Sequence, residues 1–234
     1  MEALTNGRRG GLREVTKVAW PVVISMLSYT AMGVTDTLFV GQLGTAELAG
    51  TALAATATIL LCSFFMGALR GVKVLAAQAT GAEQHDLAVA TGSQGLWLAL
   101  AGGSGVALFG LLAEPIAALL GGPVEIQTHT ATYFAIRCLA APAWFALTAI
   151  GECFQGVGDT KTAMRYTLLA NGLNVVLTAA MVPGFGPIPA MGVAGAALAT
   201  AISFNVAALA QLWRFQRRFG RIRPLDRQLM AKLL

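Results

Sequence analysis

The sequence predicts an all-α integral membrane protein with six transmembrane helices. Of its 234 residues, 56% are hydrophobic and only 12% are charged, and the mean hydropathy is +0.68. A chain of this composition lacks the polar side chains that a soluble domain needs to cover its surface. The apolar residues are gathered into long runs, and each run is long enough to cross a hydrocarbon core about 30 Å thick as a helix.

The first apolar run, Val18 to Leu43, is the most informative. Its length exceeds the apolar part of a secretory signal peptide and no small-residue cleavage site follows it, so we interpret it as a retained helix. Pro21 lies inside the run and removes one backbone hydrogen bond, which favours a bend in the helix. The other five predicted helices are Leu48 to Leu69, Leu87 to Leu112, Ala131 to Phe154, Tyr166 to Val182 and Val193 to Trp213.

The segments between these runs are polar or rich in helix-breaking residues. A short turn joins the first two helices, and VLAAQATGAEQHD is expected to form a loop or interfacial segment before the third. Glu114 to Thr130 is expected to form an amphipathic segment at the membrane surface, QGVGDTKTAMR a compact charged turn, and PGFGPIPAMG a connection rich in proline and glycine. The third helix includes Gly92, Gly95, Gly102, Gly103 and Gly105, which allow close backbone contact inside a helix bundle.

The distribution of basic residues predicts the topology. Six spans place the N-terminus, the second and fourth loops and the C-terminus on one side, and that side receives every Lys and Arg except Arg137. The positive-inside rule therefore puts both termini in the cytoplasm and predicts a multi-pass protein of the cell inner membrane. The expected organisation is a cytoplasmic segment 1–17, a six-helix unit 18–213 and a basic cytoplasmic segment 214–234.

Asp36 is the candidate functional residue that stands out most, because it is an ionisable side chain within an otherwise apolar run. An ionised carboxylate at membrane depth costs about 2.5 to 3.5 kcal/mol even on the milder insertion scales, so it requires a proton, a cation or a polar partner. One interpretation is a structural aspartate hydrogen-bonded to Thr35, Thr37 or a neighbouring helix. The other is a group that exchanges a proton or Na⁺ as the protein changes conformation.

A second polar group lies on the predicted fifth helix. Asn171, Asn174 and Thr178 are spaced by three and four residues and therefore share one helical face. Their neutral oxygens could help to coordinate Na⁺ or to hold a protonated acid, and they could equally serve as interhelical hydrogen-bonding groups. Thr200 and Asn205 on the sixth helix are weaker members of the same set.

Other ionisable and aromatic residues give weaker evidence of a functional site. Arg137 is a second intramembrane charge that could extend to the interface or pair with a far-side glutamate. His85 and His129 are isolated, so no metal site is expected, and the three cysteines are expected to be free buried thiols. Trp20 and Trp213 fit interfacial anchors, whereas Trp97 and Trp144 are expected to pack or to line a cavity.

Two other classes of function are disfavoured. Gly156 to Asp159 matches the GxGD signature of intramembrane aspartyl proteases, but its partner would have to be Asp36, which lies in the outer half of a different helix. A turn explains the motif better, and no nucleotide-binding motif or nucleophile elbow is present, so we expect neither an enzyme nor a cofactor. The net charge of +5 reflects membrane orientation, and no nucleic-acid partner is expected.

Five motifs in order resemble the multidrug and toxic compound extrusion (MATE) transporters. They are Pro21 through Asp36 to GQLG, the element from Ala77 to Ala82, FQGVGDTKTAM, the Asn171/Asn174 helix, and MGVAGAALAT. Each motif is weak alone, but together they cover nearly the whole chain and resemble the amino-terminal lobe of that family. The resemblance implies one six-helix lobe of a twelve-helix, two-lobe transporter that exports amphipathic, often cationic small molecules by cation-coupled alternating access.

The resemblance also assigns roles to residues. Asp36 matches the family's first-helix carboxylate, Pro21 the proline that bends that helix, and Asn174 and Thr200 the polar partners of the cation site. Thr178 falls where many relatives carry an aspartate, and a missing second carboxylate weakens a Na⁺ site more than a proton site. The expected coupling ion is therefore H⁺ rather than Na⁺.

Besides Thr178, the sequence departs from the family in length, because six helices are predicted where the family has twelve. The expected partners are membrane lipid and a second six-helix lobe, either in the same full-length chain or as a second copy, and we favour a fragment of a longer chain. Two alternatives stay open. A lipid-linked oligosaccharide flippase of the same superfamily would line its cavity with Arg and Lys, and a non-transporting membrane scaffold subunit would show no gradient-dependent transport.

Overall fold

The computed structural model describes residues 2–233, with side chains from residue 15 onward, and the regular secondary structure of this part of the chain is helical apart from one isolated bridge between Phe185 and Ile188. The predicted all-α class is therefore confirmed. The elements are α1 (Glu2–Gly41), α2 (Thr45–Gly81), α3 (His85–Phe109), the 3₁₀ turn η1 (Gly110–Leu112), α4 (Ala113–Leu120), α5 (Val124–Leu139), α6 (Ala141–Gly156), α7 (Thr160–Met181), α8 (Gly192–Phe219) and α9 (Arg227–Ala231).

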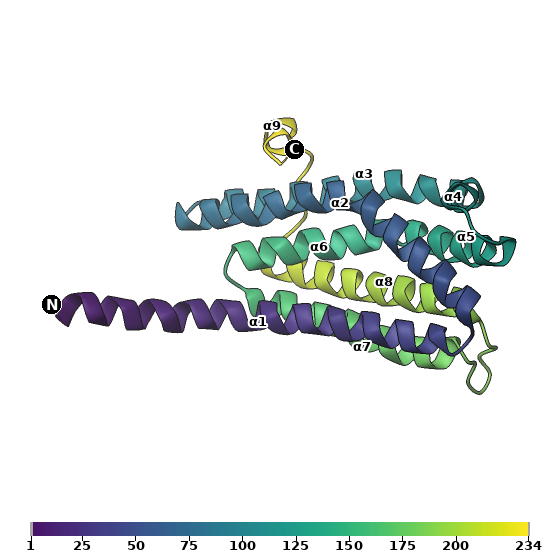
Figure 1. The fold of residues 1–234 in the computed structure, drawn as a ribbon. Coiled ribbons are helices and arrows are strands. Elements are labelled where there is room, and N and C mark those ends of the chain that lie inside the picture. Colours follow the sequence, from purple (N-terminus) through teal and green to yellow (C-terminus); the bar gives the residue numbers. More distant parts are fainter. Residues whose placement is uncertain (1, 234) are drawn as a thin grey trace.

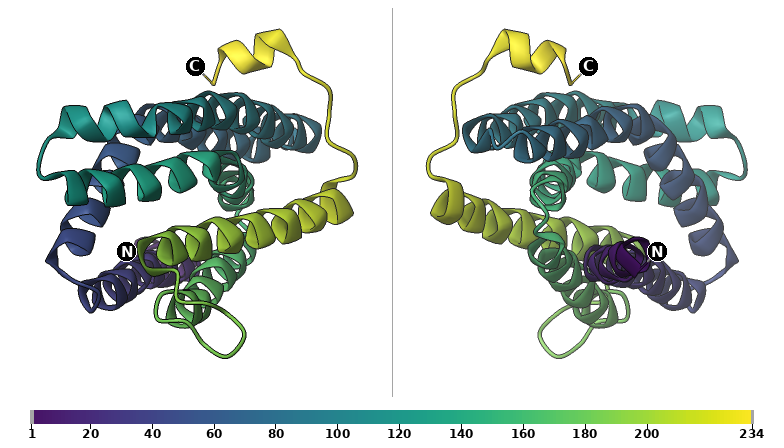
Figure 2. Two further views of the ribbon diagram at one scale, coloured as in Figure 1. Left: turned by 90° about the vertical axis from the view of Figure 1, so that its right-hand side faces the viewer. Right: turned by 90° about the vertical axis from the view of Figure 1, so that its left-hand side faces the viewer.

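The long helices form a bundle whose order in space differs from their order in the chain. Figure 1 shows α1 and α7 side by side along one edge, α3 along the opposite edge, and α6 and α8 between them. Figure 2 shows the chain after α8 running along one side of the bundle to α9, which packs against α3. The helices of the amino-terminal and carboxy-terminal parts of the chain are thus interleaved.

Five of the predicted spans satisfy length and hydropathy requirements for crossing a membrane. Within the described residues, four single helices do so, and the α5–α6 pair qualifies as one span bent by 48°. The sixth predicted span corresponds to α7, whose polar residues include Asn171 and Asn174 and which lies between α1 and α8. The arrangement is consistent with the six-helix unit, and the chain is a multi-pass membrane protein.

Pro142 explains the bend in the fourth span, which the sequence predicts as one helix from Ala131 to Phe154. The helix instead ends at Leu139 and restarts at Ala141, so that Pro142 lies in the first turn of α6. Proline is tolerated there because the N–H it lacks would have no partner within the helix. The Cα of Pro142 also lies 2.5 Å from where a Cβ on Gly103 would stand, so α3 and α6 approach with almost no space between their backbones.

Two predicted connections are corrected. VLAAQATG, expected to be a loop or interfacial segment, continues α2 to Gly81, because Leu69, Val72, Ala76 and Ala79 form a buried stripe with helical spacing. The region 114–130 is not one amphipathic segment. It is divided into α4 and the start of α5 by Gly121 and Gly122, whose φ values of +80° and +101° end the first helix.

The two ends of the bundle carry opposite charge. The α2–α3 turn, the α6–α7 turn and the end of α8 lie together at one end, which we call the basic end and which includes Arg70, Lys73, Lys161, Arg165 and the arginines from 214 to 227. The α1–α2 turn, α4 and the start of α5 form the opposite, acidic end with Glu47, Glu114 and Glu125. This separation agrees with the charge pattern used to predict the topology.

Candidate functional site

The parallel packing of α1 against α7 places Asp36 opposite Thr178. The Thr178 hydroxyl donates to Oδ1 of Asp36 over 3.0 Å, and Thr178 is fully buried while Asp36 is half-buried. Both residues lie near the acidic-end termini of their helices. The carboxylate of α1 is therefore held by a side chain of a neighbouring helix rather than by Thr35 or Thr37, whose hydroxyls donate to carbonyls of their own helix.

Asn174 links this contact to α8. Its amide and the Thr200 hydroxyl are 3.0 Å apart, and both side chains are buried. The amide satisfies both neighbours when its nitrogen faces Asp36, 3.2 Å from Oδ1, and its oxygen accepts from Thr200. We call Asp36, Asn174, Thr178 and Thr200 the polar cluster; the structure brings these four predicted site residues together from three helices.

Asn171, the fifth predicted site residue, contacts a different part of α1. Its Nδ2 donates to Oγ of Ser28 over 2.6 Å, and the Ser28 hydroxyl donates to the carbonyl of Ser25. The Oδ1 atom of Asn171 is buried without a hydrogen-bond partner in the described chain. The sequence analysis did not identify Ser28 as a site residue. Ser28 and Asp36 are eight residues apart and lie on the same face of α1, and their partners Asn171 and Thr178 are seven residues apart on the facing side of α7.

Pro21 lies well away from the polar cluster. It precedes Asp36 by 15 residues, or about 22 Å along an α-helix. The side chain of Pro21 is buried, α1 runs through it without interruption, and the Ser25 hydroxyl donates to its carbonyl over 2.8 Å. Any influence of Pro21 on the site must therefore act through the shape of α1.

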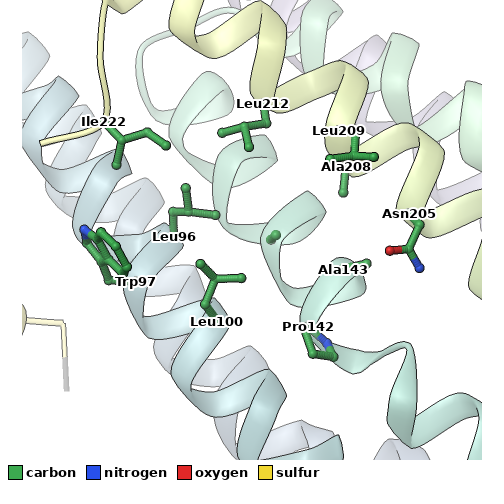
Figure 3. Close-up of a pocket in the computed structure, with 11 residues that line it drawn as sticks. Leu96, Trp97, Leu100, Pro142, Ala143, Asn205, Ala208, Leu209, Leu212 and Ile222 are labelled. Carbon is green, nitrogen blue, oxygen red and sulfur yellow. The ribbon is translucent and has the colours of Figure 1, made fainter.

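Arg137 and Asn205 do not join the cluster by direct contact. Of the two possibilities considered for Arg137, pairing with a glutamate is not found among the described residues; its guanidinium lies over the rings of Trp144 and Phe204, at 5.4 and 5.5 Å. Asn205 donates to the carbonyl of Ala201. Figure 3 shows Asn205 at the edge of an apolar groove between α3, α6 and α8, on another part of the bundle.

Asp159, the aspartate of the GxGD motif, caps α7 at the basic end. Its carboxylate accepts from the backbone N–H and the hydroxyl of Thr162, and it pairs with Arg218. Partial burial alone would raise the pKa of Asp159, but the Thr162 hydrogen bonds and the Arg218 charge together hold that pKa below its usual value. Because α7 separates Asp159 from Thr178 by about 28 Å, Asp159 and Asp36 cannot form a catalytic dyad.

The cysteines and the other possible metal ligands do not form a further site among the described residues. The three cysteines are buried and free, as expected. No group of three His, Cys, Asp or Glu side chains within residues 2–233 is placed to hold a metal ion. The polar cluster thus offers a single carboxylate with amide and hydroxyl groups, since neither α7 nor α8 contains an acidic residue.

A bundle of membrane-spanning helices with one carboxylate held between them is typical of secondary transporters. Comparison with known proteins identifies the family. Residues 21–180 match the MatE family model, and the chain belongs to this family, which is a family of transporters and not of enzymes.

Curated relatives agree with the family assignment. The chain is 29% identical over 195 residues to the "Probable multidrug resistance protein NorM" of Pseudomonas putida, covering 82% of this chain and 41% of the relative. It is 30% identical over 214 residues to the protein of that name from Neisseria meningitidis, covering 91% and 46%. The chain therefore spans less than half the length of the curated relatives it matches.

Solved structures show the same fold. A structure described as the outward-facing conformation of a multidrug resistance MATE family transporter matches with a TM-score of 0.85 at 23% identity, covering 94% of this chain and 50% of that one. A transporter of the MOP superfamily from Pyrococcus furiosus, whose binding pocket is described as having reverse polarity, matches with a TM-score of 0.83 at 22% identity. The fold corresponds to about half of each of these transporters.

Proposed function

We propose that this chain forms one lobe of a proton-coupled antiporter that exports amphipathic, often cationic compounds. The observation that carries the proposal is the polar cluster, in which one intramembrane carboxylate on α1 is bound by side chains of α7 and α8. The names of the curated relatives support multidrug export as the activity. The family fold supports a second six-helix lobe as the partner, in the same full-length chain or in a second copy.

Protonation of Asp36 would change how α1 is held. The ionised carboxylate accepts hydrogen bonds from Thr178 and Asn174, and neutralisation weakens these bonds because charge-assisted hydrogen bonds are about twice as strong as neutral ones. A protonated Asp36 also no longer carries the desolvation cost of a charge. Proton binding would therefore loosen the contact of α1 with α7, and Pro21 would let α1 bend as the cavity opens to the other side.

The proton is favoured over Na⁺ as the coupling ion. A sodium site gains affinity from each carboxylate that it includes, and the cluster contains one carboxylate together with neutral amide and hydroxyl groups. Thr178 supplies a hydroxyl at the position where a second acid would face Asp36. A single acid with hydrogen-bonding neighbours is suited to gaining and losing a proton.

The proposal includes an orientation and location. The basic end faces the cytoplasm, so that both termini lie there, and the protein resides in the cell inner membrane, as the positive-inside rule indicates. The segments 1–17 and 214–234 then lie at the cytoplasmic surface, the latter leading toward the second lobe.

A lipid-linked oligosaccharide flippase is the second candidate. Its anionic substrate would require several basic side chains inside the bundle, and among the side chains that the structure describes Arg137 is the basic one that lies in the apolar middle of the bundle. The flippase and the scaffold subunit are both distinguished from the antiporter by transport of a cationic dye under a proton gradient.

The test is Asp36→Asn in the complete protein, which keeps the shape and hydrogen-bonding capacity of the side chain but removes its titration. We expect at least a tenfold loss of proton-driven ethidium uptake into inverted membrane vesicles, the direction that corresponds to efflux from the cell, while Glu125→Gln, which neutralises an exposed carboxylate at the acidic end, retains this transport. Efflux that persists in Asp36→Asn would refute the coupling role. Dependence on a Na⁺ gradient in proteoliposomes would refute the choice of the proton, and absence of any gradient-driven transport would favour the scaffold.

A further inference from the structure

The groove in Figure 3 lies apart from the polar cluster and is lined almost entirely by apolar side chains. Its walls come from α3, α6 and α8, three helices of the membrane-spanning bundle, and its volume is about 300 Å³. Leu100 and Trp97 on one rim are about 40% exposed, and Leu209 on the other is 66% exposed. Along α8 the lining extends from Asn205 to Leu212, about 10 Å, which suits the upper part of one extended acyl chain.

The basic end of this groove is closed by the segment that follows α8. We call residues 220–226 the strap; it crosses from the end of α8 to α3, and its Ile222 lines the groove next to Leu96 and Trp97. The strap has almost no helix or strand of its own, so its backbone polar groups need other partners.

Side chains of α3 provide those partners. Gln94, only 1% exposed, donates to the carbonyl of Pro224 over 2.8 Å and accepts from the N–H of Asp226 over 3.0 Å. Ser93 accepts from the N–H of Arg223, and the indole N–H of Trp97 donates to the carbonyl of the same residue, both over 3.1 Å. Four hydrogen bonds to three α3 side chains therefore fix the strap across the end of the groove.

The strap places positive charge at this end. Arg221 and Arg223 flank Ile222 in the chain, on either side of the residue that closes the groove. Arg223 pairs with the exposed carboxylate of Asp86, whereas no carboxylate in the described part of the chain pairs with Arg221, which is exposed. An apolar channel open along its side thus ends beside an available guanidinium.

We propose that this groove is a binding site for an anionic phospholipid. One acyl chain lies between α3, α6 and α8, and the headgroup phosphate is bound by Arg221 with support from Arg223. Basic pockets between transmembrane helices on the cytoplasmic side bind anionic headgroups, because guanidinium groups form charge-assisted hydrogen bonds with phosphate. The site rests on the proposed orientation of the basic end toward the cytoplasm, but it requires no role for Asp36.

A second apolar groove offers an internal control. It lies between α2, α4 and α5, has a larger volume of about 780 Å³, and includes Ala49, Leu60 and Phe134 in its lining. This groove is at the acidic end, where the charged residues are Glu47, Glu114 and Glu125. If apolar shape alone determined lipid binding, a phospholipid would prefer the larger groove. If binding depends on the anionic headgroup, the phospholipid prefers the groove that is closed by the strap.

Lipid binding can be measured directly by native mass spectrometry of the complete protein, titrated with dioleoyl phosphatidylglycerol or dioleoyl phosphatidylcholine. We expect one phosphatidylglycerol to bind with at least fivefold higher occupancy than phosphatidylcholine. Arg221→Gln and the groove-filling change Ala143→Leu should each lower that occupancy at least fivefold, and Arg221→Lys should retain it. The matched controls are Arg214→Gln, at an exposed arginine off the groove face of α8, and Ala49→Leu in the second groove; both should bind phosphatidylglycerol as the unmodified protein does.

Equal binding of the two lipids, an equal loss in Arg214→Gln, or full binding in Ala143→Leu would overturn the proposal. A photoreactive benzoylphenylalanine at Leu209 should crosslink to phosphatidylglycerol; crosslinking to protein alone would show that another part of the transporter covers the groove. Displacement of the lipid by ethidium would assign the groove to exported compounds instead. Because no readout involves transport, a failure of this site is distinguishable from a failure of proton coupling.

Discussion

Helix α1 and the α3–α6–α8 part of the bundle are held by different kinds of interaction. Over its apolar window only 11% of α1 residues are buried, compared with 56% in α8. Between residues 15 and 41, α1 is joined to α7 by hydrogen bonds between side chains, at Ser28 and at Asp36. By contrast, α3 and α6 meet backbone to backbone at Gly103 and Pro142, and the strap ties α8 to α3.

This difference indicates which part of the lobe can change shape at low cost. Close backbone packing has few alternative arrangements, whereas a half-exposed helix held by polar contacts can move when one of those contacts changes. The titratable residue of the polar cluster is located on that less tightly packed helix. A conformational change driven by Asp36 would therefore move α1 against a frame formed by α3, α6 and α8.

A pair of glycine substitutions should expose the contrast most strongly. Gly103→Ala places a Cβ 2.5 Å from the Cα of Pro142 and 2.8 Å from its nitrogen, so the two helices must separate. We expect the free energy of unfolding to fall by about 1 to 3 kcal/mol. The measurement is the thermal unfolding temperature of the purified protein in one fixed detergent.

The matched control is Gly33→Ala on α1, where the added Cβ has no atom within 4 Å. Alanine is the better helix former by about 1 kcal/mol, so this change should leave the unfolding temperature unaltered or raise it. Equal destabilisation by the two substitutions would mean that α1 is packed as closely as the frame, which would remove the basis of the comparison.

Thr178→Val tests the hold on α1 with a smaller expected effect. Valine keeps the shape of the buried side chain but removes the hydroxyl that donates to Asp36. A hydrogen bond to a charged group contributes about 1.5 to 3 kcal/mol to stability. Because the half-buried carboxylate regains part of this from Asn174 and water, we expect the free energy of unfolding to fall by about 1 kcal/mol. Amide hydrogen exchange should rise in α1 around Asp36 and stay unchanged in α3. Thr178→Ser, which keeps the hydroxyl, should exchange as the unmodified protein does, and equal rates in all three would show that this hydrogen bond does not hold α1.

The sequence was sufficient to predict the membrane-spanning segments and the set of polar residues in the cluster, but not where every helix begins and ends. Long apolar runs define spans, and spacing by three and four placed Asn174 and Thr178 on one face of their helix. Spacing within one helix does not show which residue on another helix lies opposite. The register of α1 against α7 therefore came only from the structure, and with it the pairing of Ser28 with Asn171.

The strap and the length of α2 could not be predicted for other physical reasons. The strap has no hydrophobic period, and the residues that fix it, such as Gln94, precede it by about 130 residues in the chain. Gln94 reads in the sequence as an ordinary polar residue of an apolar helix. In α2 the polar residues of VLAAQATG led to the prediction of a loop. The small apolar residues between them form a buried stripe, which is recognised only when α3 is seen packed against α2.

The smallest expected effect concerns the cap of α7 at the basic end, where Asp159 pairs with Arg218 of α8, a helix of the frame. Because the folded pKa of Asp159 lies below that of an exposed aspartate, about 3.9, its contribution to stability is fully present above about pH 4 and is lost as the pH falls through the lower folded value. Asp159→Asn should thus lower the unfolding temperature slightly at neutral pH, and the difference from the unmodified protein should stay constant down to about pH 5 and shrink below pH 4. Glu125→Gln provides the comparison at an exposed carboxylate of the acidic end. A difference that persists unchanged at pH 3 would show that the Asp159 carboxylate does not stabilise the α6–α7 turn through its charge, and that its pairing with Arg218 does not tie α7 to the frame.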